Sequence, residues 1–258
     1  MLWTLWSTAP AIVIRTLRAC RSAGLRIASP FETAADLEAP PLWLRRHTGK
    51  ISNIESAAAA TIRLVREYTV VRPGDAVLDA GCGFGVMARP LAECFGTEGR
   101  YVGLDRDGAS IRWAQKNIAA SDPRFRFVLG STSSRFPAGD EDIGFVLAKS
   151  LFTHLKEIDA RRALGEIARV LTRGRSALIT AFLFEEDSPP EKVFPFADAA
   201  RSIRWRLKFR PEAAIAYERV HFSRMVTANG LRIDTFRPGF WPGSDHLKAQ
   251  DVLVLSKE

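Results

Sequence analysis

The sequence predicts an α/β fold in which helices cover both faces of a doubly wound, parallel sheet. Two observations predict it. Short apolar runs alternate along the chain with segments of helical spacing, and a turn rich in glycine follows the first apolar run. The chain has 258 residues, 47% of them apolar, which is enough for one large domain with a substantial core.

The expected elements follow in order. Strands are expected near residues 75–80, 101–105, 125–129, 143–149 and 176–183. The helix after the first strand stops at Gly96, and the helix after the second strand is ended by Pro123. Residues 158–171 have apolar side chains at helical spacing and precede the fifth strand.

The glycine turn is residues 79–85, which read Asp-Ala-Gly-Cys-Gly-Phe-Gly. Gly81 and Gly83 let the backbone turn tightly and approach a ligand, and we expect Gly85 to open a helix whose amide groups face the site. A dinucleotide-binding turn requires a further glycine where this chain has Val86. The carboxylate of Asp79 suits a ligand that carries an ammonium and a sulfonium group better than it suits a pyrophosphate.

The second strand also ends in an acid. Asp105 lies 105 − 79 = 26 residues after Asp79. At the tip of the second parallel strand, its carboxylate can accept both hydroxyl groups of a ribose. The alternative is that Asp105 caps a helix, because residues 108–110 lead into a helical run.

Residues 70–258 resemble the class I S-adenosylmethionine-dependent methyltransferase family. The resemblance rests on the glycine turn, on the acid that ends the next strand, and on later segments that follow in the family's order, at residues 150–155, 166–171 and 250–255. It implies a Rossmann-like sheet, mostly parallel with an antiparallel last strand. Residues 231–234 and 251–255 are the candidates for its sixth and seventh strands.

The resemblance implies S-adenosylmethionine as cofactor. Family members often carry an acid after the third strand that reads the adenine amino group. This chain has Ser131 there, which leaves adenine recognition open. The residues expected at the cofactor are Asp79, Ala80, Gly81, Cys82, Gly83, Gly85, Asp105, Arg106 and Ser131.

Two histidines are candidates for a catalytic base, which a hydroxyl acceptor would require. His154 follows the fourth strand, near the expected position of the methyl group, although a histidine that packs or caps the next helix would look the same. His221 lies on an amphipathic run, where a structural role is the alternative. Three scattered cysteines offer no metal site, and we expect no metal.

Two segments outside the sheet are expected to set substrate choice. Residues 1–50 form a basic amphipathic extension that would act as a lid, a dimerisation element or a membrane-surface anchor. Residues 51–258 form the methyltransferase domain, with a substrate-binding insert near residues 188–216. Within it, residues 204–210 alternate cations with apolar residues. On a strand this pattern would place all the charge on one face, for an anionic acceptor or membrane, or as a solvated edge.

We therefore expect methyl transfer from S-adenosylmethionine to a small-molecule, sugar or lipid-linked acceptor, at a hydroxyl group. The alternatives are an RNA or protein methyltransferase, or a non-catalytic cofactor-binding partner subunit. The net charge of +8 raises nucleic acid as a partner, but we do not expect it, since no recognisable RNA-binding module is present. Other expectations are a homodimer and a cytoplasmic location, with contact to the inner membrane surface through the N-terminal segment.

Overall fold

The computed structural model describes residues 40–41, 44, 54–188, 192–239 and 250–257. The chain divides into two units, residues 1–46 and 47–258, and every helix and strand named below lies in the second. The predicted N-terminal extension falls almost entirely outside the described residues. Within the described part of the chain, no helix is both long enough and apolar enough to cross a membrane.

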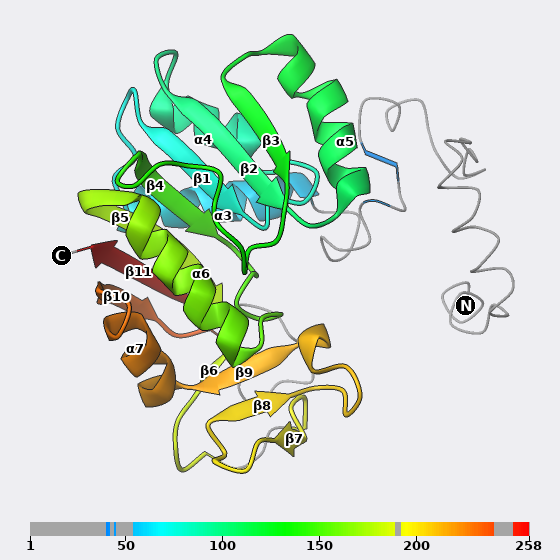
Figure 1. Cartoon of the computed structure of the whole chain (residues 1–258), viewed down its shortest axis with the longest axis vertical. Helices are drawn as coiled ribbons and strands as arrows, with labels where there is room; N and C mark the ends of the chain where they lie inside the picture. The colour runs from blue at the N-terminus through cyan, green and yellow to red at the C-terminus, as the bar shows by residue number, and fades with distance from the viewer. Residues whose placement is uncertain (1–39, 42–43, 45–53, 189–191, 240–249, 258) are drawn as a thin grey trace, which may run out of the picture. The chain divides into compact units, whose positions relative to one another are not determined.

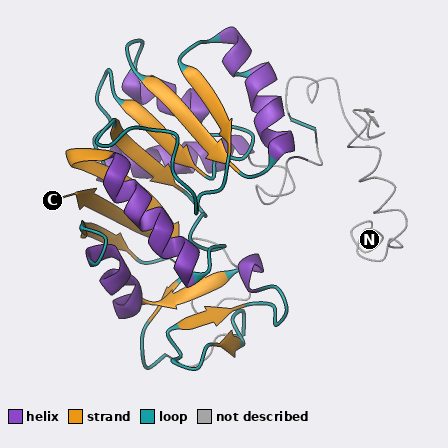
Figure 2. Ribbon diagram, viewed as in Figure 1, coloured by secondary structure: helices purple, strands orange, loops and turns teal. Residues whose placement is uncertain are grey.

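A seven-stranded sheet forms the centre of the second unit (Figure 1, Figure 2). Its strand order is β10-β11-β5-β4-β1-β2-β3. The strands are β1 (Ala76–Ala80), β2 (Arg100–Asp105), β3 (Phe125–Leu129), β4 (Ile143–Ala148), β5 (Leu171–Ala181), β10 (Leu231–Arg237) and β11 (Asp251–Lys257). Neighbours from β3 to β5 pair in parallel, whereas β11 runs antiparallel to both β5 and β10. The predicted doubly wound sheet with an antiparallel last strand is thus confirmed.

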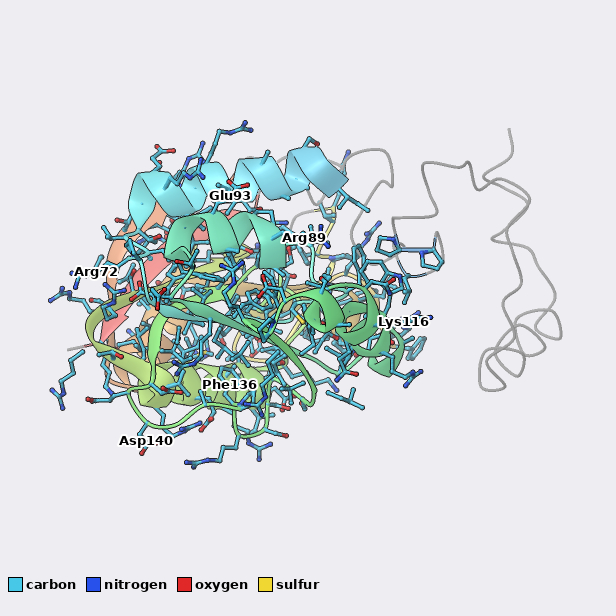
Figure 3. The ribbon with its side chains drawn as sticks, turned by 90° about the horizontal axis from the view of Figure 1, so that it is seen from above. Arg72, Arg89, Glu93, Lys116, Phe136 and Asp140 are labelled. Carbon is cyan, nitrogen blue, oxygen red and sulfur yellow. The ribbon has the colours of Figure 1, made fainter. Side chains whose placement is uncertain are left out.

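Helices cover both faces of this sheet. One face packs against α3 (Ile54–Tyr68), α4 (Ala88–Phe95) and α5 (Gly108–Asn117), and the other against α6 (Glu157–Val170) and α7 (Arg219–Thr227). Figure 3 shows Arg89 and Glu93 of α4 on one side of the sheet and Phe136 and Asp140 on the other. The central strands β1 and β4 are buried along their whole length, which explains their apolar sequences.

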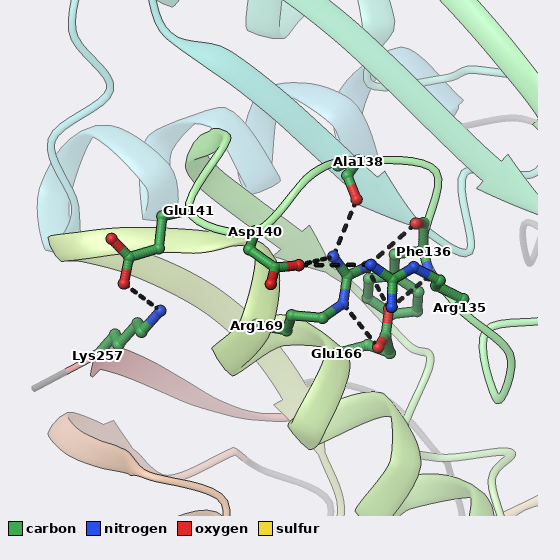
Figure 4. Close-up of polar contacts among 8 residues, drawn as sticks. All are labelled: Arg135, Phe136, Ala138, Asp140, Glu141, Glu166, Arg169 and Lys257. Atoms are coloured by element: carbon green, nitrogen blue, oxygen red, sulfur yellow. Dashed lines mark hydrogen bonds and ion pairs between the residues drawn. The ribbon is translucent and has the colours of Figure 1, made fainter.

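The loop between β3 and β4 is fastened to α6 by a charged network (Figure 4). Glu166 accepts a hydrogen bond from the backbone amide of Phe136 at 2.6 Å and pairs with Arg169 at 2.6 Å. Arg169 in turn donates to the carboxylate of Asp140 at 2.8 Å and to the carbonyl of Ala138 at 3.0 Å. Arg169 keeps the pKa of Glu166 below its usual value. The network holds the chain that leaves the third strand tip against the helix that follows β4.

A second, four-stranded sheet is inserted between β5 and α7. Its strands, in the order β6-β9-β8-β7, are β6 (Leu183–Phe184), β9 (Ile215–Glu218), β8 (Ile203–Trp205) and β7 (Phe196–Ala197). Only the pairing of β6 with β9 is parallel. A short helical turn, η4 (Pro211–Ala213), precedes β9.

The inserted sheet corrects the interpretation of the basic tract. Strand β8 ends at Trp205, and residues 206–210 form a turn, so the predicted alternation along a strand is wrong. Arg204 is 6% exposed, because its guanidinium lies 3.8 Å from the centre of the Phe184 ring and donates to the Ser188 carbonyl at 2.6 Å. One cation of the tract therefore points inward, and the others lie beyond the strand.

Candidate functional site

The glycine turn leaves β1 at the edge where the parallel strands end. Gly81, Gly83 and Gly85 have φ values of 87°, 55° and 86°, in the region that favours glycine. A right-handed helix requires negative φ, so α4 begins only at Ala88. The expectation that Gly85 opens the helix is therefore wrong by three residues, although the turn itself has the predicted form.

The space around these glycines differs. A Cβ atom built on Gly85 would lie 2.8 Å from Cε1 of Phe127 and 2.9 Å from Cδ1 of Ile118, so this glycine permits close packing. A Cβ atom on Gly83 would meet no atom of the described residues within 4 Å. The backbone at Gly83 is thus open to the approach of a ligand, and the backbone at Gly85 is not.

Asp105 ties the glycine turn to the tip of β2. Its Oδ2 accepts a hydrogen bond from the amide of Gly83 at 2.8 Å, and its Oδ1 accepts one from the amide of Asp107 at 2.8 Å. The cap of α5 is Asp107, whose carboxylate accepts from the amide of Ala109, so the helix-cap interpretation of Asp105 is wrong. Each oxygen of Asp105 keeps further acceptor capacity, which fits the two hydroxyl groups of a ribose.

Asp79 lies at the adjacent strand tip and is 3% exposed. Its pKa is raised to about 7. Burial is the largest cause and the charge of Asp105 adds to the rise, whereas the hydrogen bond from Tyr101 and the charge of Lys149 oppose it. Tyr101 donates to Oδ2 of Asp79 at 2.7 Å. A buried carboxyl group of this kind is stabilised as an anion by a positively charged ligand, such as an ammonium or a sulfonium.

The sequence interpretation missed Tyr101 and Lys149. Tyr101 lies on β2, next to β1, and reaches Asp79 across the strand pair. Lys149 directly follows β4 on the other side of β1, and burial lowers its pKa. A tyrosine and a lysine in otherwise apolar strand segments are the signals that could have identified both.

Cys82 packs inward from the turn. It is 6% exposed, and a Cβ atom on Gly103 would lie 2.8 Å from its sulfur, so the thiol fills the space beside β2. Burial raises its pKa well above the ordinary value, which argues against a nucleophilic thiolate. Ala80, the last residue of β1, is fully buried.

The end of β3 lies beside the end of β2, because the amide of Gly130 donates to the carbonyl of Asp105 at 2.9 Å. Ser131 therefore stands at the same edge of the sheet as Asp105, and its hydroxyl lies 2.7 Å from that of Ser133. Arg106, next to Asp105, is exposed. The geometry agrees with the predicted cofactor edge, and the cofactor-binding roles of Ser131, Arg106 and the other predicted site residues stay predictions.

Three hydrogen bonds fasten residues 153–155, just after β4, to the inserted sheet. They join the Thr153 carbonyl to the Ile215 amide (2.8 Å), Nδ1 of His154 to the Glu212 carbonyl (2.9 Å), and the Leu155 carbonyl to the Tyr217 hydroxyl (2.5 Å). A carbonyl oxygen only accepts, so Nδ1 of His154 carries a proton. In the neutral ring Nε2 then keeps its lone pair, and the residue is exposed.

His221 lies on α7 and its ring faces α6. Its backbone amide donates to Glu218, the cap of α7, at 2.5 Å, and its Nε2 lies 3.3 Å from Oε1 of Glu157 on α6. The first contact caps α7 and the second joins α7 to α6, and both favour a structural role over that of a base. Among the described residues, no group of three or more His, Cys, Asp and Glu side chains could hold a metal ion.

Comparisons with known proteins point to one kind of domain. Residues 77–174 match the family model described as a methyltransferase domain. The chain is 36% identical over 109 residues to the ribosomal RNA small subunit methyltransferase H of Solidesulfovibrio magneticus, which covers 40% of this chain and 33% of that protein. It is 35% identical over 113 residues to the ribosomal protein L11 methyltransferase of Thermus thermophilus, which covers 44% of this chain and 41% of that protein. The chain thus spans between a third and two-fifths of the length of these relatives.

A solved structure extends the likeness to most of the fold. It is a methyltransferase in complex with the Haloferax volcanii Trm112 methyltransferase activator, with a TM-score of 0.59 and 16% identity, and the match covers 83% of this chain and 95% of that one. At this identity the likeness concerns the fold. The family match thus shows a methyltransferase domain at residues 77–174, and the solved structure shows that most of the chain has the fold of a methyltransferase.

Proposed function

We propose that this protein transfers a methyl group from S-adenosylmethionine to a hydroxyl group of a small-molecule, sugar or lipid-linked acceptor. When bound, the cofactor supplies a methyl group that its sulfonium already activates, so the protein mainly has to align the partners. Asp79 would hold the positively charged part of the cofactor, the open backbone at Gly83 would admit it, and Asp105 would accept its ribose hydroxyl groups.

The observation that carries the choice of a hydroxyl is the orientation of His154. Its Nδ1 is engaged by the Glu212 carbonyl at 2.9 Å, which leaves Nε2 of the neutral ring as a proton acceptor. A hydroxyl acceptor must lose its proton as it is methylated, whereas a neutral amine needs no such base before it attacks. A histidine held in this tautomer in the loop after β4 could take that proton.

A second candidate function is methylation of RNA or protein. The names of the two relatives specify ribosomal RNA and a ribosomal protein, although each aligns with less than half of this chain. We therefore propose a screen that includes every one of these acceptor classes. Purified protein would be incubated with labelled S-adenosylmethionine and a cell extract separated into small molecules, lipids, RNA and protein.

The test of the proposal is label transfer into the first two fractions, with His154→Ala as the diagnostic variant. We expect this variant to lower kcat by about 100-fold or more, because it removes a general base, while the Kd for S-adenosylmethionine changes less than about twofold. His221→Ala is the matched control and should leave kcat near that of the parent. Label found only in RNA or protein would refute the acceptor class, and equal kcat in the His154 variant would refute the base.

A further inference from the structure

The turn after β8 exposes an unusual set of side chains. Residues 206–210 read Arg-Leu-Lys-Phe-Arg, and all five are exposed. Phe209 is 89% exposed and Leu207 is 45% exposed. No acidic residue occurs between positions 199 and 211, so the turn carries three positive charges around two apolar side chains. We call residues 206–210 the cationic tip.

Two backbone hydrogen bonds fix the conformation of the cationic tip. The amide of Arg206 donates to the Ala214 carbonyl at 3.0 Å, and the amide of Arg210 donates to the Leu207 carbonyl at 3.0 Å. Arg204, on β8 two residues before the tip, is buried against Phe184 and hydrogen-bonded to Ser188. Because the inward cation already anchors the hairpin, packing of the inserted sheet does not account for the outward side chains.

A hollow of about 220 Å³ lies beside the cationic tip. Its lining consists of two cations, Lys192 and Arg206, and two apolar residues, Val193 and Leu207. A space of this composition suits an anionic group that is attached to an apolar chain.

We propose that the cationic tip docks this protein on an anionic phospholipid bilayer. Phe209 and Leu207 would enter the interface, and Arg206, Lys208 and Arg210 would lie among the headgroup phosphates. A single-stranded nucleic acid is the other polyanion to consider, but bases stack on aromatic rings and not on an aliphatic side chain. The pairing of Leu207 with Phe209 therefore favours lipid.

The proposal can be tested by sedimentation of the full chain with vesicles of phosphatidylcholine alone and of phosphatidylcholine mixed with phosphatidylglycerol. We expect binding to the mixed vesicles that weakens with salt. Combined Arg206→Gln, Lys208→Gln and Arg210→Gln should weaken it by about a hundredfold, since each cation near an anionic surface contributes about a fivefold factor. Combined Leu207→Ser and Phe209→Ser should weaken it by about tenfold or more without removing the salt dependence.

The control removes the same net charge elsewhere. Arg89, Arg112 and Lys116 are exposed on α4 and α5, and their combined replacement by Gln should leave vesicle binding near that of the parent. Equal losses in this control and in the charge variant of the tip would overturn the proposal, as would unchanged binding in both tip variants. Tighter binding to single-stranded RNA than to vesicles, lost in the same variants, would assign the tip to nucleic acid instead. Titration with S-adenosylmethionine checks the fold of each variant, and vesicle binding needs no methyl transfer, so this proposal can fail independently of the proposed function.

Discussion

At the scale of one residue, the buried carboxyl group of Asp79 lowers the stability of the free protein when it is ionised. Its pKa is about 7 in the folded chain against an ordinary value of 3.8. Between these two values the folded state holds the proton more tightly than the unfolded state does, so the free energy of unfolding falls as the pH rises from about 4 to about 7. Above about pH 7 the folded protein carries a buried anion, which lowers the free energy of unfolding.

We therefore expect Asp79→Asn to raise Tm at pH 8 by about 3 °C or more and to leave Tm almost unchanged at pH 4. The amide oxygen of Asn can still accept from Tyr101, so the geometry is preserved. Thermal unfolding monitored by circular dichroism at both pH values measures this. A lower Tm of the variant at pH 8 would mean that the carboxylate stabilises the free protein, contrary to the argument.

The same carboxyl group predicts how cofactor affinity depends on pH. A cationic ligand favours the ionised form, so binding should release a proton and the affinity for S-adenosylmethionine should rise between pH 5.5 and 7. The increase is expected to approach about tenfold per pH unit at the acidic end. Calorimetric titration of Asp79→Asn is the control, in which the affinity should be weaker and nearly independent of pH. A parallel pH dependence in parent and variant would locate the titrating group elsewhere.

Single residues were predictable where the position on a strand fixed their place. Asp79 and Asp105 each end a strand, and parallel strands bring such ends to one edge. Asp107 was not identified as the helix cap, because Asp105 and Asp107 both precede the helix and the sequence does not show which backbone amides each carboxylate meets. Arg204 was misplaced because a cation in a basic tract gives no sign of the aromatic ring that receives it.

At the scale of elements, replacing a glycine of the turn by alanine should affect stability differently at two positions. Gly85→Ala would force a Cβ atom to within 2.8 Å of Phe127 at a φ of 86°, and we expect it to lower the free energy of unfolding by about 3 kcal/mol. Gly83→Ala is the matched control, since its Cβ atom would meet none of the residues that the structure describes and its φ of 55° costs about 1 kcal/mol.

The two variants should separate again in cofactor binding. The methyl group of Gly83→Ala would point into the open space of the site, so the affinity for S-adenosylmethionine should fall by about tenfold or more while the protein remains folded. Urea unfolding and calorimetric titration of both variants provide the measurements. If Gly83→Ala binds as well as the parent does, the ligand does not approach the backbone at this residue.

The central strands β1 and β4 were predictable because burial on both faces makes their sequences mostly apolar. The inserted sheet was not predictable as strands, since β6 and β7 have two residues each and β8 has three. Such short strands show no period, and the partner of β6 is β9, far along the chain. The start of α4 was misplaced for a local reason, because positive φ at three glycines delays the helix.

At the scale of the whole molecule, the inserted sheet and the loop after β4 form one arrangement that no local pattern describes. The hydrogen bonds from His154 and Leu155 reach residues 58 and 62 positions later in the sequence. The sequence supported an insert near residues 188–216 and a histidine after the fourth strand as separate expectations. Only the folded chain places the insert where it can orient the histidine.

This arrangement predicts that Tyr217 acts on catalysis through the loop that carries His154. Tyr217→Phe removes the hydroxyl that donates to the Leu155 carbonyl and should cost about 1 kcal/mol of stability. If the inserted sheet positions His154, kcat should fall about five- to tenfold in this variant. The Kd for S-adenosylmethionine should stay within about twofold, because Asp79 and Asp105 lie on strands of the main sheet. Tyr68→Phe, on α3, is the control and should alter neither quantity. A loss of cofactor affinity equal to the loss of kcat would mean that Tyr217 supports the cofactor site itself. An unchanged kcat would mean that the loop after β4 keeps His154 in place without the hydrogen bond from the inserted sheet.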